Sequence, residues 1–426
     1  MSYVARWALA ALLVLAAPLH AAPAGPSWIE SWGTPLPLVP PPPPPFGKPA
    51  GGETPAPRPP FVTYPANLSD QTVRMIVRTS AGGSSFRLEF ANVQLGSTVH
   101  IGAIHAGLAG PAGSIVAGSD RGVTFGGRGD LLLFPGARVL SDPIPLAVPA
   151  LTDVAVSIYV PGRVATETVD PLSLVPTYVA KGNQAAQGQL AEAQLTGAYF
   201  WLRGLSVPAA RPDAGTIVAF GDSITEGYAT TAGAHRSWPE LLAERLQRDP
   251  ALAKWGVVNA GISGNRVLRT GAGDAAVARF DADVLTRPGV KWVILLEGIN
   301  DINMSIMPGM PDGQKATAEE IIGGLESLVS RAHAQGIRVA GGTIMPTKGL
   351  PFYSAEGEAM RQAINAWIRT SGRVDAVIDF DSATRDPADP LRLRPDIDPG
   401  DHVHPNDAGN ARMAAAVDPA IFKNSR

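Results

Sequence analysis

The C-terminal half of the chain alternates short apolar runs with longer segments whose apolar residues recur every three to four positions. Short runs of this kind are typical of buried strands, and the longer segments are typical of amphipathic helices. The predicted strands are Thr216–Phe220, Val257–Asn259, Trp292–Glu297, Ile337–Ile344 and Val374–Phe380, and the predicted helices are Trp238–Arg248, Ala318–Gln335 and Glu356–Thr370. This alternation predicts an α/β domain, in which a five-stranded parallel sheet carries helices on both faces.

The region from about Asn67 to Val207 has a different pattern, because its apolar residues alternate with polar ones. Val73, Met75 and Val77 alternate with Arg74 and Arg78. A period of two indicates half-buried β-strands. The turn sequence Ala81-Gly82-Gly83-Ser84 predicts a hairpin between this strand and the next, around Phe86–Phe90. Repeated glycine and proline breaks favour an all-β sandwich or jelly roll.

The first 62 residues have the composition of a targeting segment followed by a linker. Met1–Arg6 is basic, Trp7–Ala17 is an apolar stretch too short to span a bilayer, and Ala21, Ala22 and Ala24 are small cleavage candidates. A proline-dense stretch from Pro35 to Pro60 follows Trp28 and Trp32. We therefore predict a signal peptide (1–24), a Trp-anchored Pro-rich segment (25–62), a β-sandwich domain (63–210) and an α/β domain (211–426).

Composition is consistent with export and excludes some partners. The chain has 426 residues, 45% of them hydrophobic, which is enough for two cores. Its formal net charge of −3 gives no reason to expect nucleic acid. It has no cysteine, so its stability depends on packing without disulfides. We expect a bacterial protein that is secreted or periplasmic, with no stable membrane anchor.

Ser223 follows the first predicted strand of the α/β half, within the run Phe220-Gly221-Asp222-Ser223-Ile224-Thr225-Glu226-Gly227. In open α/β sheets, ligands bind outside the carboxyl ends of the strands, near the point where strand order reverses. For the order 2-1-3-4-5 that point lies between the first and third strands, which Ser223 and Asn300 follow. Ser223 is therefore a candidate nucleophile.

Two further strands lead into candidate hydrogen-bond donors. Val257–Asn259 leads into a glycine-bearing turn that contains Gly264, where the main chain can approach a ligand closely and offer an N–H. Asn300 follows Trp292–Glu297 and can donate from its side-chain amide. Both positions suit donors to a developing oxyanion.

A candidate base lies near the C-terminus, in Asp401-His402-Val403-His404-Pro405. Imidazole can accept and return a proton near neutral pH, and a carboxylate on its other nitrogen fixes the tautomer. Asp401 lies one turn before His404, a spacing that brings side chains together, so we favour His404 over His402. Asp396 or Asp398 could orient the base instead, or these residues could join Asp386, Asp389 and Asp401 in a cation site, although a solvated loop is the simpler interpretation.

These four segments, in this order, resemble the SGNH hydrolase superfamily, also called the GDSL esterases. The resemblance covers about Asp213 to Ile421, and Ile224 stands where the family's name has leucine. It implies a flavodoxin-like three-layer fold, Ser223 as nucleophile with His404 and Asp401, and an oxyanion hole formed by Ser223, Gly264 and Asn300. It implies no cofactor and no metal. The β-region resembles the N-terminal domain of a branch similar to a xylanase-cluster acylhydrolase.

The resemblance implies a secreted serine esterase that cleaves carboxylic esters through an acyl-enzyme. A carbohydrate acetylesterase or an arylesterase is the first expectation, with small acyl esters or acylated glycans as substrates. Two alternatives stay open at this point. One is a lysophospholipase or thioesterase, and the other is a glycan-binding module with an inactive hydrolase fold. The sequence does not indicate the oligomeric state.

Overall fold

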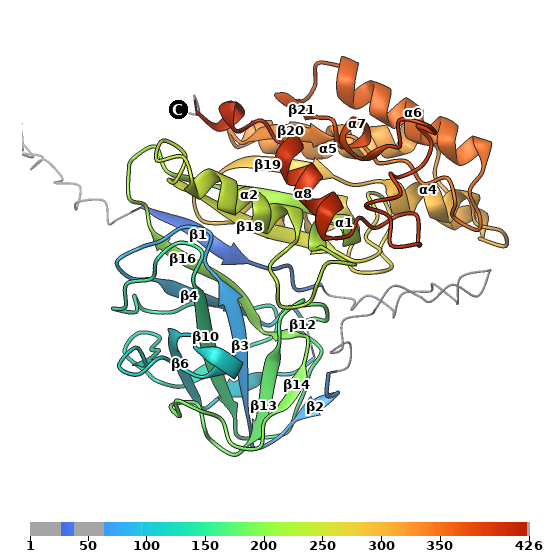
Figure 1. The fold of residues 1–426 in the computed structure, drawn as a ribbon. Coiled ribbons are helices and arrows are strands. Elements are labelled where there is room, and N and C mark those ends of the chain that lie inside the picture. Colours follow the sequence, from blue (N-terminus) through green and yellow to red (C-terminus); the bar gives the residue numbers. More distant parts are fainter. Residues whose placement is uncertain (1–26, 38–63, 95, 424–426) are drawn as a thin grey trace, which may run out of the picture.

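The computed structural model describes residues 27–37, 64–94 and 96–423. The predicted signal peptide and most of the proline-rich segment lie outside these residues. Two large hydrophobic clusters divide most of the described core between a C-terminal α/β part and an N-terminal β-rich part (Figure 1). None of the helices in the described ranges is both long and apolar enough to cross a membrane.

The α/β part is built on one parallel sheet. Its strand order is β18 (Trp255–Ile262), β17 (Gly215–Asp222), β19 (Val290–Leu296), β20 (Arg338–Gly342) and β21 (Ala376–Ile378). All four pairings are parallel, so the predicted fold class and the order 2-1-3-4-5 are confirmed. The central strands are apolar and buried because helices cover both faces of the sheet.

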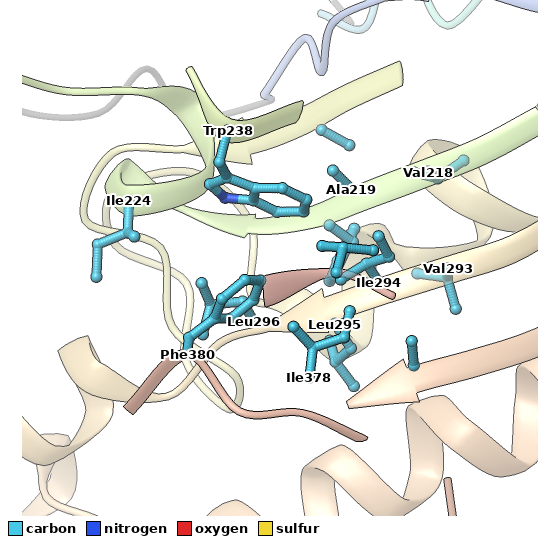
Figure 2. Close-up of a cluster of buried hydrophobic side chains, with 14 of the residues drawn as sticks. Val218, Ala219, Ile224, Trp238, Val293, Ile294, Leu295, Leu296, Ile378 and Phe380 are labelled. Atoms are coloured by element: carbon cyan, nitrogen blue, oxygen red, sulfur yellow. The ribbon is translucent and has the colours of Figure 1, made fainter. Parts of the chain in front are cut away.

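The helices lie in two groups on the two faces (Figure 1). One group is α2 (Trp238–Gln247), α7 (Phe380–Thr384) and α8 (Asp407–Ala416). The other is α3 (Ala276–Phe280), α4 (Ile299–Ile306), α5 (Ala318–Ala334) and α6 (Ala355–Thr370). Figure 2 shows Trp238 and Phe380 over the strand residues Ile294 and Leu296, and the two rings lie 5.5 Å apart between centroids. The described residues also include the short helix α1 (Ser223–Glu226) and the segments η2 (Asp281–Leu285), η3 (Asp312–Gln314) and η4 (Pro419–Phe422), while η1 (Pro111–Gly113) lies in the β-rich part.

The N-terminal part consists mostly of antiparallel sheets, as predicted. One sheet has the order β1 (Trp28–Gly33), β16 (Leu202–Pro208), β4 (Arg87–Ala91), β9 (Arg138–Leu140). The other has the order β14 (Gln194–Thr196), β13 (Thr177–Lys181), β3 (Gln71–Arg78), β10 (Asp153–Val160), β6 (Ala103–Leu108), β7 (Arg121–Gly122). Three strand pairs complete it: β2 (Asn67–Leu68) with β11 (Val164–Ala165), β5 (Val99–Ile101) with β8 (Leu131–Leu133), and β12 (Val169–Asp170) with β15 (Tyr199–Phe200). Residues of both larger sheets share one buried cluster, which is the arrangement of a sandwich.

The predicted hairpin between β3 and β4 is wrong. β3 pairs with β10 and β13, whereas β4 pairs with β16 and β9 in the other sheet. The turn residues between them instead bond to distant segments, since Gly83 forms a bridge with Val148 and the Ser80 N–H donates to the Ser31 carbonyl of β1. The chain therefore passes from one sheet to the other between β3 and β4, where the turn sequence predicted a hairpin within one sheet.

Strand β1 joins the two parts of the molecule. It pairs with β16 in the sandwich and also packs against β18 of the parallel sheet. The Glu30 N–H donates to Thr216 Oγ1 at 2.8 Å, and the buried Glu30 carboxylate pairs with Arg287 at 2.8 Å. The described part of the predicted Trp-anchored segment is thus a strand at this seam, and the exact domain boundaries stay a prediction.

Candidate active site

Ser223 lies directly at the end of β17, where the chain turns into the short helix α1 (Ser223–Glu226). Asp222 caps this helix, because its Oδ1 accepts the Ile224 N–H at 2.9 Å. Burial raises the pKa of Asp222 to about 6, although that hydrogen bond acts in the opposite direction. The turn holds the Ser223 side chain at the carboxyl edge of the sheet, with only 6% of the residue exposed.

His404 and Asp401 meet Ser223 from the loop before α8. The Ser223 Oγ lies 2.8 Å from His404 Nε2, and His404 Nδ1 lies 2.8 Å from Asp401 Oδ2. Asp401 Oδ1 also accepts the backbone N–H of His404 at 2.9 Å, so the carboxylate is hydrogen-bonded to both the ring and the main chain of His404. The ring of Tyr228 packs 4.5 Å from the imidazole between centroids. The three predicted residues therefore form one continuous hydrogen-bonded chain.

The charge state of Asp401 follows from this pairing. Burial by itself would raise the pKa of its carboxyl group, but the hydrogen bond from His404 and its charge outweigh burial and lower it. Asp401 is thus an ionised carboxylate at neutral pH, which suits a group that holds one imidazole tautomer.

The competing residues of the same loop have other partners. His402 Nδ1 lies 2.6 Å from Asp398 Oδ2, and its ring lies against Gly349. Asp396 binds Arg394 and Arg412. The structure therefore brings His404, and not His402, to Ser223, and it leaves Asp398 to the neighbouring histidine.

The acidic residues that could have formed a cation site are dispersed. Asp389 pairs with Lys348 and Arg392, and Asp386 accepts the Ala388 N–H. Within the part of the chain that the structure describes, no group of three or more His, Cys, Asp or Glu residues is placed to hold a metal ion.

The two predicted donors lie beside Ser223. Gly264 follows β18 with a positive φ of 76°, a conformation that favours glycine, and Asn300 lies in the first turn of α4. The Asn300 amide nitrogen donates to the Asn265 carbonyl at 2.9 Å, which fixes the side chain. An amide nitrogen carries two N–H groups, so this bond leaves one for a ligand.

Sequence reasoning missed the side chains that hold these loops together. Arg279 is buried and donates to the carbonyls of Gly221 (2.8 Å) and Ala260 (2.9 Å) and to Asn265 Oδ1 (2.9 Å). Asp301 accepts the N–H groups of Val267 (2.7 Å) and Leu268 (3.2 Å). No periodicity or spacing identifies such residues, because they act on strand ends and turns that are distant in sequence. Asp301 alone had a local signal, as the neighbour of Asn300.

Ser223, His404 and the two candidate donors face one pocket of about 250 Å³, which we call the catalytic pocket. Ser223, His404, Gly264 and Asn300 line its floor together with other residues. Its remaining walls are mostly apolar. They include Tyr228, Gly271, Ala272, Met304, Met307 and Phe352, and polar groups come from Ser263, Arg266, Asn303 and Gln314.

Comparison with known proteins identifies the class. Residues 219–412 match the model of the GDSL-like Lipase/Acylhydrolase family, which covers the candidate site from β17 to α8. Residues 219–412 therefore form a GDSL-like lipase/acylhydrolase domain, and the protein is a carboxylic ester hydrolase. The predicted resemblance is confirmed for this domain. The likeness of the β-rich region to one branch of the superfamily stays a prediction.

Solved structures with this fold cover about half of the chain. A G-D-S-L family protein from Desulfitobacterium hafniense is 21% identical, covering 47% of this chain and 96% of its own, with a TM-score of 0.36. A putative acylhydrolase from Bacteroides fragilis is 21% identical, covering 51% and 92%, with a TM-score of 0.38. An acetylxylan esterase from Geobacillus stearothermophilus is 23% identical, covering 48% and 94%, with a TM-score of 0.38. The search of curated proteins gave no match.

Proposed function

We propose that the protein is a serine esterase that transfers the acyl group of a carboxylic ester first to Ser223 and then to water. The observation that carries this proposal is the hydrogen-bonded chain from Ser223 Oγ through His404 to Asp401, with both links at 2.8 Å. A serine hydroxyl is a weak nucleophile until a neighbouring base removes its proton. This arrangement supplies that base and the carboxylate that orients it.

In the acylation step, Ser223 Oγ attacks the ester carbonyl carbon while His404 Nε2 takes the hydroxyl proton. The tetrahedral intermediate collapses, the bond to the alcohol oxygen breaks, and His404 returns the proton to the leaving alcohol. A water molecule then attacks the acyl-enzyme and gives a proton to His404, which passes it back to Ser223 Oγ as the acid leaves. Asp401 stabilises the imidazolium in both halves and is not itself protonated.

The negative charge that forms on the carbonyl oxygen needs donors. The Ser223 N–H, the Gly264 N–H and the Asn300 amide are the proposed set, because Gly264 and Asn300 line the catalytic pocket beside Ser223. Each donor in such a site is typically worth about 3–4 kcal/mol of transition-state stabilisation.

The pocket walls bear on the substrate. Met304, Met307 and Phe352 offer apolar surface, and methionine side chains adapt to irregular apolar groups. This favours an ester with an apolar acyl or aryl group, as in an arylesterase or a lipid-type esterase, over an acetyl group carried on a polysaccharide. Acetylated glycans remain the competing substrate class that the experiment must separate.

We also propose that the enzyme is exported. The support is the basic, then apolar, then small-residue pattern of residues 1–24, which lie outside the described residues. N-terminal sequencing of the protein from periplasm or medium tests this. A mature N-terminus after Ala21, Ala22 or Ala24 supports export, and an intact N-terminus in the cytoplasm contradicts it.

The test of function compares wild type with Ser223→Ala on nitrophenyl acetate, butyrate and octanoate, beside acetate release from acetylated xylan. We expect Ser223→Ala to lower kcat by about 10⁴-fold or more, with an unchanged melting curve. We expect the wild-type kcat/KM to rise from acetate to butyrate. Full activity of Ser223→Ala would refute the mechanism, and a preference for acetylated xylan would reverse the substrate assignment.

A further inference from the structure

Glu226, the last residue of α1, is a buried carboxyl group that the proposed reaction does not use. Only 8% of the residue is exposed. Its Oε2 accepts the hydroxyl hydrogen of Ser263, and the Ser263 backbone N–H also donates to the carboxyl group. Ser263 directly precedes Gly264, one of the proposed oxyanion donors. Glu226 thus connects the helix that begins at Ser223 with the turn that presents Gly264.

The main chains of these two segments are also in close contact. Asn259 of β18 donates from Nδ2 to the carbonyls of Thr225 (2.8 Å) and Glu226 (3.3 Å). A Cβ atom at Gly261 would lie 2.2 Å from the Glu226 nitrogen, so only glycine permits this approach. The hydrogen bond from Ser263 to the Glu226 carboxyl group adds a contact at the turn that follows β18. A shift of this turn would move the Gly264 N–H relative to Ser223.

We propose that Glu226 is a positioning residue, which holds Ser263 and thereby fixes the Gly264 N–H against the helix that carries Ser223. This inference rests on the proposed function, because it assigns Gly264 to the oxyanion hole. A donor must lie within hydrogen-bond distance of the oxygen in the transition state, so a small displacement of the turn lowers the rate without changing substrate binding.

The surroundings of Glu226 favour the neutral form of its carboxyl group. Burial is the main cause that raises its pKa well above the usual value, and the nearby Asp170 and Asp222 raise it further. A neutral carboxyl group still accepts both bonds from Ser263 through its oxygens. If it ionised, its negative charge would lie beside the site where the oxyanion forms and would oppose catalysis.

The β-rich part of the molecule provides this burial. Glu226 lines a second cavity, of about 80 Å³, which we call the interdomain cavity because residues of both parts surround it. Its charged neighbours there are Asp170 of β12, Arg78 of β3 and Glu240 of α2, and Glu240 is itself bonded to His235 at 2.7 Å. Leu174 packs over the end of α1, where its Cδ1 lies 3.1 Å from the position of a Cβ on Gly227. Residues of the β-rich part thus cover Glu226 and the end of α1.

The test uses the full-length protein with Glu226→Ala, Glu226→Gln and the control Glu240→Ala. The control also removes a carboxyl group that lines the interdomain cavity, here a half-buried one, but leaves the oxyanion turn untouched. We expect Glu226→Ala to lower kcat by about 30-fold or more, with KM within about threefold of wild type. We expect Glu226→Gln, whose amide oxygen still accepts from Ser263, and Glu240→Ala to keep kcat within about threefold.

The pH profile gives a readout that a merely structural role would not change. Toward alkaline pH we expect wild-type kcat to fall as Glu226 ionises, and we expect Glu226→Gln to lose that fall. Should Glu226→Ala fail to fold, Ser263→Ala replaces it, with an expected fall in kcat of about three- to tenfold at unchanged KM and melting temperature.

Unchanged kcat in Glu226→Ala, or in Ser263→Ala where that variant replaces it, would overturn the inference. So would a loss of kcat in Glu226→Gln or in Glu240→Ala as large as that in Glu226→Ala. Superimposable pH profiles of wild type and Glu226→Gln would also overturn it. Ser223→Ala separates this outcome from failure of the proposed function. If Ser223→Ala is inactive while Glu226→Ala is normal, only the role of Glu226 is wrong.

Discussion

The catalytic pocket and the interdomain cavity share the short helix α1, because Ser223 lines the first and Glu226 lines the second. His404, which lines the first, is bonded to Asp401 behind it, and that pairing lowers the pKa of the Asp401 carboxyl group. In the second, Asp170 and Glu226 receive hydrogen bonds from neutral donors, and burial raises the pKa of both, to about 6 for Asp170. The folded structure therefore favours the ionised form of Asp401 and disfavours the ionised forms of Asp170 and Glu226.

This difference separates two uses of a carboxyl group. A paired carboxylate can stabilise a positive charge that appears during a reaction, as Asp401 does for the proposed imidazolium. A neutral carboxyl group can fix hydrogen-bond geometry without placing a negative charge beside a developing oxyanion. Asp401 is thus proposed to support Ser223 through its charge, and Glu226 is proposed to support it by fixing the position of a hydrogen-bond donor.

The largest effect should come from neutralising the charged member. Asp401→Asn presents an N–H to His404 Nδ1 and so favours the tautomer that cannot accept the Ser223 proton. We expect kcat to fall by about 10³- to 10⁴-fold. The matched control is Asp398→Asn, which alters the neighbouring pair with His402 and should leave kcat within about fivefold. Steady-state kinetics on nitrophenyl butyrate measures kcat of both variants. Equal losses of kcat would contradict the assignment of the catalytic role to the Asp401–His404 pair and not to the Asp398–His402 pair.

An intermediate effect should come from removing a neutral donor in the same pocket. Asn300→Ala deletes the side-chain amide that is proposed to bind the oxyanion, and it leaves the Ser223–His404–Asp401 chain in place. We expect kcat to fall by about 10²- to 10³-fold with little change in KM. Saturation kinetics distinguishes the two constants, and a rise in KM at constant kcat would show that Asn300 binds substrate instead.

The smallest effect on activity should come from Asp170, which acts on stability. Because its folded pKa is raised from 3.8 to about 6, the stabilisation from its protonated form is complete below about pH 4 and is lost as pH rises through about 6. Asp170→Asn removes that loss, and its amide can still accept the Leu172 N–H. We expect the variant to be more stable than wild type at pH 7 by about 1–3 kcal/mol, and similar to it at pH 4. Urea unfolding at both pH values tests this, and a variant less stable at pH 7 would refute it.

The parts that sequence could predict are those with local or periodic signals. The parallel sheet follows from continuous apolar runs, and the predicted start of α2 at Trp238, just before Pro239, is confirmed. The three residues Ser223, Asp401 and His404 each stand next to a turn signal, so their motifs could be identified separately. Their meeting in space could not be derived from any one motif, and their catalytic roles stay a proposal.

The parts that sequence could not predict depend on distant neighbours. Arg74 alternates with apolar residues like a surface residue, yet it is buried, with its guanidinium donating to the carbonyls of Gly113 (3.0 Å) and Gly188 (3.2 Å). The partner of β3 was misassigned for the same reason, because glycine-rich turn chemistry does not reveal a crossing between sheets. Glu226 gave no signal either, since its importance depends on the approach of β18 and on burial by the sandwich.

The central claim is that an acyl group is transferred to one hydroxyl, and covalent labelling tests it most directly. A fluorophosphonate reacts with an activated serine, and peptide mass spectrometry locates the adduct. We predict one adduct, on Ser223, that accumulates in proportion to the loss of esterase activity and is absent from Ser223→Ala and His404→Ala. Activity that survives complete modification of Ser223, or an adduct on another residue that accounts for inactivation, would contradict the account.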